Sequence, residues 1–309
     1  MLSRLVRLLL LAELLALAGV GAWLHLEQGW TLAAVAAGAI GLLLGLRLVF
    51  VLASFTVSRM AASPRPPGSA LSPGVRLRMW AREYRAVLGS NFLGVPFPHL
   101  VTPKEPATER GTRIPVVLVH GYFGNRGFFG PLMRCLARQG IAPVFAPDFP
   151  ATFATIEDFA AALETEVERI AQATGQPRVI LVCHSMGGLA ARRYLANRGA
   201  ARVAKVVTIA SPHGGTVLSA FGLGRNAAQM RLDCAFIQEL RRDEEGRAPC
   251  PFTSVYSLDD NMVSPHDTSR LGWARNVALH AVGHITILQS RRTYSVLLEE
   301  LAEAGARPT

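Results

Sequence analysis

The stretch from Val179 to Tyr194, VILVCHSMGGLAARRY, constrains this chain more than any other. Five apolar residues lead into His184 and Ser185, and two glycines and a helical pattern of apolar residues follow. The pattern predicts a buried strand, a very tight turn with Ser185 at its tip, and a helix that begins at Met186. Such a turn lifts the serine hydroxyl clear of the sheet, where a base and a substrate can reach it. The N–H group of Met186 then faces any negative charge that develops beside the serine.

The chain on both sides of this stretch alternates short apolar segments with helical ones. Alternating strands and helices predict a mostly parallel sheet that is covered by helices on both faces, the α/β class. The expected strands are 114–119, 142–146, 179–183, 205–210, 253–257 and 277–282. The expected helices are 128–139, 156–174, 186–198, 233–242 and 291–303. One domain from 114 to 309 is therefore expected, and its irregular part, 217–250, is either a lid over the substrate or a solvated excursion.

Two further polar motifs follow predicted strands near the end of the chain. The segment 254–265, SVYSLDDNMVSP, is a strand followed by an acidic turn, and Gly283-His284 follows the last strand. A carboxylate in the first motif could orient a histidine in the second, and the histidine could in turn deprotonate Ser185. An Asp-Asp-Asn turn is also a common surface composition, so the acidic motif alone does not establish such a role.

Together these motifs resemble those of the α/β-hydrolases, and most of all the bacterial triacylglycerol lipases and esterases. The usual nucleophile motif of that family is Gly-x-Ser-x-Gly, and Cys183 stands here in place of its first glycine. The resemblance, which covers 114–303, implies that Ser185 is the nucleophile and His284 the base. The family spacing Asp-x-x-Val selects Asp260 as the acid, with Asp259 as its alternative. Serine, acid and histidine then occur in the chain order of this fold.

The resemblance also implies an oxyanion hole. The segment 116–122, VVLVHGY, ends a strand in His-Gly, and in similar lipases the next residue donates its N–H to the oxyanion. The expected donors are therefore the N–H groups of Tyr122 and Met186. His120 and His213 are expected to brace loops rather than to transfer protons. Asp148 precedes Ser185 in the chain, so we interpret it as loop structure as well.

The chemistry implied by the resemblance is ester hydrolysis through an acyl-enzyme, with no metal or organic cofactor. The four cysteines show no Cys-x-x-Cys spacing, so they also give no reason to expect a metal site. Three alternatives stay open: an acyltransferase that uses the same three residues, a hydrolase that cleaves amides or thioesters, and a non-catalytic membrane scaffold with a hydrolase fold.

Two long apolar runs precede the α/β part. Residues 5–24 and 30–57 are each long enough to span the ~30 Å hydrocarbon core, and Trp23 and Trp30 flank the short polar joint between them. We interpret 1–58 as a transmembrane hairpin; a cleaved signal peptide is the alternative for the first run. Within the hairpin, Glu13 and Arg47 either pair with each other, or Arg47 extends towards an interface.

Arginines flank the two runs only on the side away from the joint. The positive-inside rule then places both ends of the hairpin, and with them the catalytic domain, in the cytoplasm, and places the protein in the inner membrane as a two-pass protein. The arginines of this side are Arg4, Arg7, Arg59, Arg65, Arg76, Arg78, Arg82 and Arg85.

Residues 59–113 are expected to join the hairpin to the catalytic domain. They begin with a Pro- and Ser-rich linker and continue with a basic amphipathic helix over 75–88. That helix either lies in the membrane interface or packs against the catalytic domain. The net charge of +10 suits an anionic partner, and since no nucleic-acid-binding motif is present, the lipid bilayer is the expected one.

Overall fold

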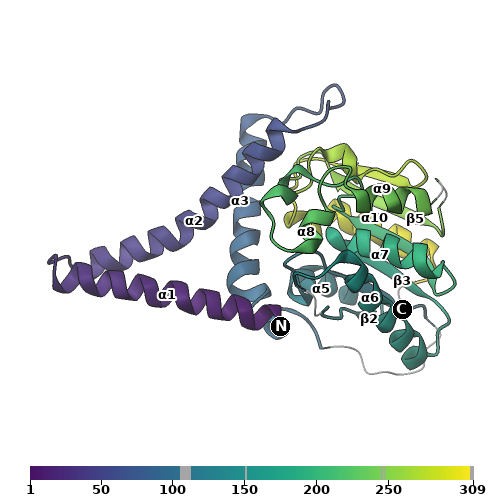
Figure 1. Cartoon of the computed structure of the whole chain (residues 1–309), viewed down its shortest axis with the longest axis horizontal. Coiled ribbons are helices and arrows are strands. Elements are labelled where there is room, and N and C mark those ends of the chain that lie inside the picture. The colour runs from purple at the N-terminus through teal and green to yellow at the C-terminus, as the bar shows by residue number, and fades with distance from the viewer. Residues whose placement is uncertain (105–112, 150–151, 245, 247, 307–309) are drawn as a thin grey trace.

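The computed structural model describes residues 1–104, 113–149, 152–244, 246 and 248–306. Within these ranges six parallel strands form one sheet in the order β2-β1-β3-β4-β5-β6 (Figure 1). The strands are β1 (Val116–Val119), β2 (Val144–Phe145), β3 (Val179–His184), β4 (Val203–Ile209), β5 (Phe252–Ser257) and β6 (Arg275–Leu279). The chain therefore has the predicted α/β architecture, and each predicted strand is present with bounds shifted by a few residues.

Helices cover both faces of the sheet. One face packs against α6 (Ile156–Thr174), α7 (Met186–Arg198) and α9 (Ala235–Asp243). The other packs against α5 (Gly130–Arg138) and α10 (Arg291–Glu303). Neighbouring residues of one strand, such as Ile180 and Leu181, belong to opposite clusters, because successive side chains of a strand point to opposite faces. The central strands are consequently buried along their whole length, which explains their continuous apolar sequence.

The helix bounds follow from local sequence signals. Thr155 and Asp158 form a reciprocal capping box at the start of α6, and Gly175 ends that helix in a left-handed conformation with φ of 68°. The predicted ranges of α6, α7 and α10 agree with the structure. The short helices α4 (Pro98–Val101) and α8 (Arg225–Gln229) were not predicted. Single turns of 3-10 or π helix occur at Ser90–Gly94, Arg126–Phe129, Val217–Phe221, His266–Ser269 and Thr286–Gln289.

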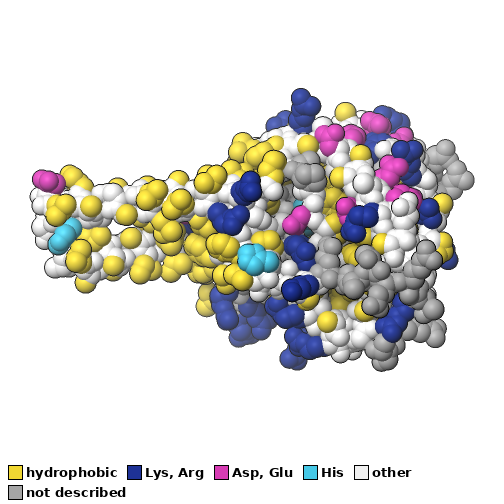
Figure 2. Space-filling view, turned by 90° about the horizontal axis from the view of Figure 1, so that it is seen from below, with side chains coloured by type: hydrophobic (Ala, Val, Ile, Leu, Met, Phe, Trp, Pro, Cys, Tyr) yellow, Lys and Arg dark blue, Asp and Glu magenta, His cyan; other side chains and the backbone are white. Residues whose placement is uncertain are grey.

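The N-terminal runs form two long helices, α1 (Leu2–Leu26) and α2 (Leu32–Met60), both long and apolar enough to cross a membrane. They meet at the short turn and diverge towards the catalytic domain, so that the hairpin has the shape of a V (Figure 1). Figure 2 shows one face of the V, on which hydrophobic side chains predominate along the helices and basic side chains gather where the V joins the rest of the molecule. Glu13 of α1 and Arg47 of α2 form an ion pair across the hairpin.

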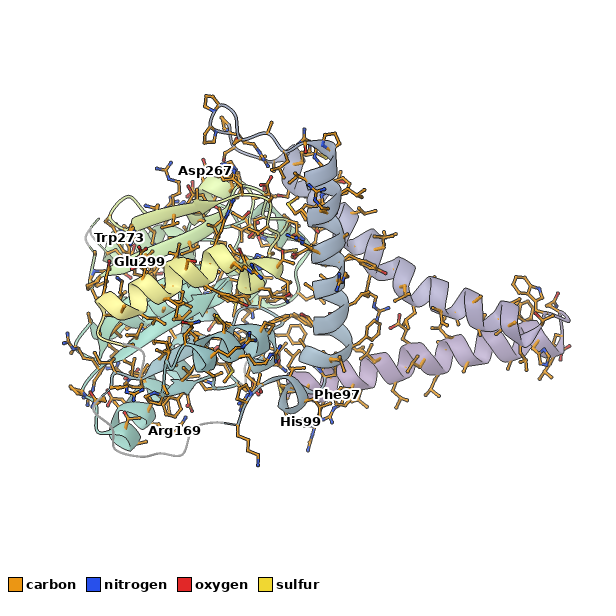
Figure 3. All side chains as sticks on the ribbon, turned by 180° about the vertical axis from the view of Figure 1, so that it is seen from behind. Phe97, His99, Arg169, Asp267, Trp273 and Glu299 are labelled. Atoms are coloured by element: carbon orange, nitrogen blue, oxygen red, sulfur yellow. The ribbon has the colours of Figure 1, made fainter. Side chains whose placement is uncertain are left out.

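Helix α3 (Pro73–Gly89) crosses the open end of the V and stands between the hairpin and the catalytic domain (Figures 1 and 3). Its N-terminus is capped by Ser72, and Pro73 occupies the first turn. Met79, Glu83 and Val87 are buried, whereas its arginines Arg78, Arg82 and Arg85 are exposed. Of the two expectations for this helix, packing against the catalytic domain is therefore present.

The boundaries expected from the sequence need adjustment at the hairpin. Helix α2 continues to Met60, two residues beyond the expected end of the hairpin at 58. Residues 105–112 of the expected linker, 245 and 247 of the expected lid, and 307–309 at the end of the expected catalytic domain lie outside the described residues.

Candidate active site

Ser185 lies at a strained bend between β3 and α7. Its φ of 56° and ψ of −127° fall in a region that is unfavourable for a residue with a Cβ. Two glycines leave the space that the bend requires, because a Cβ at either position would lie too close to neighbouring atoms. A Cβ on Gly187 would lie 2.5 Å from the carbonyl oxygen of Val119, and one on Gly121 would lie 2.8 Å from the Cβ of Ser185. The His-Gly loop after β1 and the serine turn are thus in direct backbone contact.

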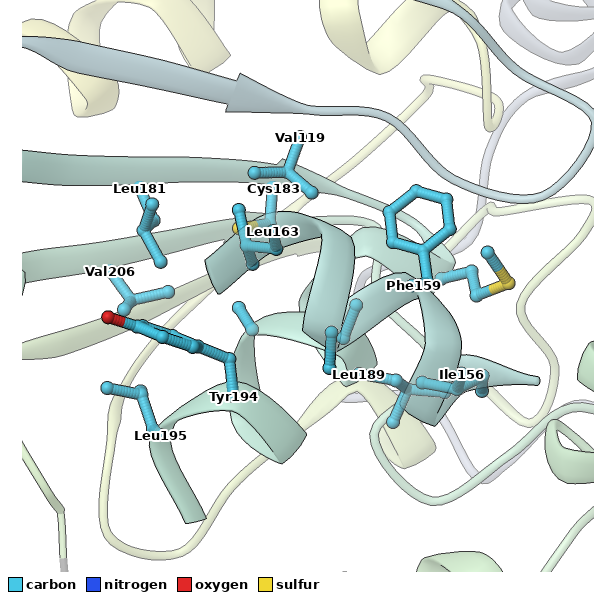
Figure 4. Close-up of a cluster of buried hydrophobic side chains, with 14 of the residues drawn as sticks. Val119, Ile156, Phe159, Leu163, Leu181, Cys183, Leu189, Tyr194, Leu195 and Val206 are labelled. Atoms are coloured by element: carbon cyan, nitrogen blue, oxygen red, sulfur yellow. The ribbon is translucent and has the colours of Figure 1, made fainter. Parts of the chain in front are cut away.

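Cys183 does not disturb this bend. Its side chain is fully buried and belongs to the hydrophobic cluster between the sheet and α6, next to Val119 and Leu163 (Figure 4). Burial raises the pKa of the Cys183 thiol, so the group stays neutral and behaves as a small apolar residue. The position usually held by glycine accepts it because its side chain points into the core.

The imidazole of His284 lies between Ser185 and Asp260. Its Nε2 is 3.1 Å from Ser185 Oγ, and its Nδ1 is 3.1 Å from each carboxylate oxygen of Asp260. The Asp260 carboxylate also accepts the backbone N–H groups of Met262 (2.7 Å) and Val263 (2.9 Å). A carboxylate at Nδ1 fixes the tautomer in which Nε2 is free to accept a proton from the serine.

Asp259 takes a different part in the structure. Its carboxylate pairs with Arg65 at 2.7 Å and accepts the N–H of Ala281 at 2.8 Å. Among the described contacts, the carboxylate that lies within hydrogen-bond distance of His284 is therefore that of Asp260 and not that of Asp259.

Burial and charge act against each other at His284. Burial disfavours the imidazolium, whereas the Asp260 carboxylate and its hydrogen bond favour it, and the carboxyl of Glu83 adds to this effect. The net result is a pKa of His284 above its usual value. A base with a raised pKa accepts the serine proton more readily in the transition state.

The two N–H groups expected to form an oxyanion hole lie near Ser185. Met186 is the first residue of α7, where backbone N–H groups have no partner within the helix. Gly121 brings the second loop so close that its own Cβ position is 3.0 Å from the Met186 nitrogen. Within the described part of the chain, neither Tyr122 nor Met186 donates its backbone N–H to another backbone group.

The other polar candidates form hydrogen bonds with groups other than the Ser185 hydroxyl. His120 accepts the N–H of Phe149 at its Nε2 (3.1 Å) and contacts the Gly121 carbonyl with its Nδ1 (3.1 Å), so it braces the loop, and burial lowers its pKa. His213 lies 3.0 Å from Thr208 Oγ1, and burial sets its pKa well below the usual value. Asp148 accepts the N–H of Arg126 at 2.7 Å.

Comparison with known proteins shows the family of the chain. Residues 116–302 match the family model of the alpha/beta hydrolase family, which is more than half of the chain. The chain belongs to the α/β-hydrolase family. Among the described residues of this hydrolase, no group of three or more histidine, cysteine or acidic side chains could hold a metal ion.

Individual relatives of the hydrolase are distant. A triacylglycerol lipase of Vibrio cholerae is 34% identical over 113 residues, and the match covers 35% of each chain, so this hydrolase matches about a third of the length of that relative. Aspergillus fumigatus lipase B has a TM-score of 0.58 at 19% identity, over 66% of this chain and 56% of its own. Bacillus licheniformis lipase BlEst2 has a TM-score of 0.53 at 19% identity, over 65% and 95%. Such structural likeness shows the shared fold.

Sequence reasoning missed Glu83 of α3, which lies behind the histidine loop of the hydrolase. Its carboxyl accepts the N–H of Ile285 (2.8 Å), the N–H of Thr286 (3.0 Å) and the hydroxyl of Thr286 (2.7 Å). Burial raises the pKa of Glu83, and these hydrogen bonds act in the opposite direction. The signal for it was its place in the helix, since Glu83 lies four residues from both Met79 and Val87 and so shares their apolar face.

The loop that carries Asp260 is held by α2 and the linker. Ser58 donates its hydroxyl to the Asp260 carbonyl at 2.6 Å, and Ser54 accepts the amide of Asn261 at 2.9 Å. Arg65 donates to the Leu258 carbonyl at 2.8 Å. The side-chain oxygen of Asn261 in turn accepts the N–H of His284 at 2.9 Å. The N-terminal helices thus contact both the loop that carries Asp260 and the loop that carries His284.

Ser185 and His284 open into one large cavity of about 780 Å³. One wall is formed by the segment after β4, including Leu218, Phe221 and Leu223. This segment lies within the expected lid and is tied down at two points: the Tyr122 hydroxyl donates to the Leu223 carbonyl at 2.8 Å, and Val217 donates its N–H to Ser264 at 2.9 Å. Another part of the lining comes from the hairpin, chiefly from α2.

Proposed function

We propose that this chain is a membrane-anchored serine hydrolase that cleaves carboxylic esters, with lipid esters as its substrates. The observation that carries the proposal is the imidazole of His284, 3.1 Å from Ser185 Oγ on one side and 3.1 Å from the Asp260 carboxylate on the other. The similarity to lipases supports the choice of esters.

In the proposed reaction Ser185 Oγ attacks the ester carbonyl carbon while His284 Nε2 takes the hydroxyl proton. The oxyanion is held by the N–H groups of Tyr122 and Met186, and the loss of one such donor typically raises the barrier by ~3 kcal/mol. As the tetrahedral intermediate collapses, His284 gives its proton to the departing alcohol. Water, activated by the same imidazole, then attacks the acyl-enzyme and releases the carboxylic acid. Asp260 orients His284 and stabilises its cationic form throughout.

The two apolar helices support a bilayer anchor for this enzyme. We propose that α1 and α2 span the inner membrane, that residues 59–113 connect them to the catalytic domain, and that residues 114–309 form that domain on the cytoplasmic side. The arginines on the side of the catalytic domain support this orientation. An anchor of this kind raises the local concentration of lipid at the site.

Labelling with a fluorophosphonate probe tests the nucleophile. We expect the full-length protein in detergent to be labelled and to hydrolyse a panel of esters, and we expect Ser185→Ala to do neither. Equal labelling or equal hydrolysis by Ser185→Ala would disprove the proposal. In the presence of a competing alcohol, the free acid should remain the main product; a new ester in its place would identify an acyltransferase.

The proposed orientation has its own test. A C-terminal reporter that is active only in the periplasm should be inactive when it is fused to the full chain. An active reporter would place the catalytic domain on the opposite side of the membrane and leave the chemistry unaffected.

A further inference from the structure

The hairpin contributes side chains directly to the cavity that contains the candidate nucleophile. Val6 of α1 and Leu46, Phe50, Ala53 and Val57 of α2 line it together with Ser185. A helix that served only as a tether would have no reason to share a cavity with the reacting hydroxyl. The volume of about 780 Å³ lies within the range of ~300–1,000 Å³ that is usual for ligand sites.

Each charged side chain in the described lining already has an ion-pair or hydrogen-bond partner. Arg47 pairs with Glu13 and lies 5.1 Å from the ring centre of Phe92. Glu83 is bonded to the histidine loop. The remaining hairpin lining is almost wholly aliphatic or aromatic. A lining of this kind favours an uncharged, apolar part of a substrate, because it offers no free charge to an ionic one.

In the proposed topology, the part of the cavity lining that belongs to the hairpin is level with the membrane leaflet nearest the catalytic domain. At ~1.5 Å per residue, Leu46 and Val57 are ~22 and ~39 Å along α2 from the turn at Thr31. The slant of α2 in the V shortens both depths (Figure 1). With the turn at the far interface of a ~30 Å hydrocarbon core, this part of the lining lies at the boundary of the leaflet next to the catalytic domain.

The rim of the cavity carries apolar side chains that are exposed. Phe221 and Leu223 line the cavity and keep 76% and 66% of their surface exposed. The helical turn Val217–Phe221 contacts α2, so these side chains continue the apolar surface of the hairpin. Exposed apolar groups next to a lipid-facing helix are favourable where lipid covers them.

We propose that the cavity between Ser185 and α2 is the acyl-chain site for a lipid ester that enters laterally from the adjacent leaflet, past the exposed side chains of Phe221 and Leu223. This inference rests on the proposed function and deepens it. The substrate is then an uncharged acyl ester that is resident in the bilayer, and α2 is a wall of its binding site. The ester carbonyl lies at Ser185 while the acyl chain still contacts the hairpin.

Filling the site at Ala53 tests the proposal. Ala53 is exposed and lines the cavity, whereas Ala37 is an exposed alanine of the same helix outside the lining. With Ala53→Trp, the full-length protein in vesicles should show at least a ~10-fold fall in the ratio of its activity on a long-chain diacylglycerol to its activity on a short soluble ester. Ala37→Trp should leave both activities within ~2-fold.

An equal effect of Ala53→Trp and Ala37→Trp on the long-chain substrate would overturn the proposal, and so would an equal loss of both esters with Ala53→Trp. Either result leaves the proposed function standing as long as Ser185→Ala is inactive. Conversely, an active Ser185→Ala variant would refute the proposed function before the acyl site is tested.

The lateral route has a separate test that uses the unaltered chain. Long-chain diacylglycerol placed in the same vesicles as the protein should be cleaved at least ~10-fold faster than the same amount in separate vesicles, since only the first lies in the leaflet that adjoins the cavity. Equal rates would show that the lipid arrives through water and would overturn the lateral route.

Discussion

The two halves of the candidate site are held in different ways. Ser185 and the loop of Tyr122 are positioned by backbone contacts within the catalytic domain, through Gly121 and Gly187. Asp260 and His284 lie on loops that bond to side chains of the N-terminal helices. The first half lies within residues 116–302, which match the family model. The second half also depends on contacts from helices that precede this range.

The two halves of the site should also differ in how well they tolerate substitutions. A backbone contact at a glycine leaves no space for an added atom, so a single added methyl group should disrupt the half of the site that contains Ser185. The hydrogen bonds from Ser58, Arg65 and Glu83 each contribute only a modest free energy. Removal of any one of them should therefore reduce the activity only modestly. It follows that the N-terminal helices hold the loops of Asp260 and His284 in addition to forming the proposed membrane anchor.

The sharpest test within the half that contains Asp260 and His284 is Asp260→Asn. An amide leaves the wrong histidine tautomer in place, so kcat for ester hydrolysis should fall by ~10⁴-fold. The matched change Asp259→Asn alters only the contacts with Arg65 and Ala281, and steady-state kinetics should show a much smaller loss. A larger effect of Asp259→Asn would exchange the roles of the two acids.

Gly187→Ala tests the half of the site that contains Ser185. The new methyl would lie 2.5 Å from the Val119 carbonyl oxygen, so unfolding free energy should decrease by ~1–3 kcal/mol. Gly89→Ala is the control, because nothing lies within 4 Å of its Cβ position. Thermal unfolding of both variants in detergent measures the difference. If the two were equally stable, the close contact would not hold the bend.

Glu83→Gln tests whether α3 acts on the base. It keeps the size of the side chain but removes a charge that raises the pKa of His284. His284 must be neutral to accept the serine proton, and activity is lost as pH falls through its pKa. The variant should therefore move the acid limb of kcat/KM to lower pH and lower kcat by ~10-fold, with KM little changed. An unmoved limb would mean that Glu83 acts only through its hydrogen bonds.

Ser58→Ala should have the smallest effect. It removes the hydroxyl that donates to the Asp260 carbonyl, and a typical hydrogen bond contributes ~1 kcal/mol, so kcat/KM should fall by no more than about 10-fold. Thr56→Ala is the control, since that hydroxyl bonds only within its own helix, to Leu52. Equal kinetics of the two variants would show that the hairpin contact leaves the acid loop unaffected.

Sequence patterns predicted the parts of the fold that are set by local signals. The buried run before Ser185 identified β3, and the spacing of Asp260 and His284 placed both after strands that end at the same edge of the sheet. The Cys183 substitution could be read as harmless because cysteine is small and apolar. These inferences need no knowledge of distant contacts.

The contacts between the N-terminal helices and the catalytic loops could not be predicted in the same way. Glu83 stands among arginines, and nothing in its neighbourhood indicates that its partner is Thr286. Likewise, no periodicity connects Ser58 with Asp260. A hydrogen bond between segments so far apart depends on how the helices dock, which is decided by the packing of the whole molecule.

The contacts of Ser58 with Asp260 and of Glu83 with Thr286 join residues 202 and 203 positions apart. Ribosomes make the chain from its N-terminus at ~5–20 residues per second, so the acid and the base emerge ~10–40 s after the helices that hold them. The hairpin is available for membrane insertion during that interval. In the proposed topology the chain therefore has time to insert into the bilayer before Asp260 and His284 are synthesised, so the proposed lipid hydrolysis would begin only after membrane insertion.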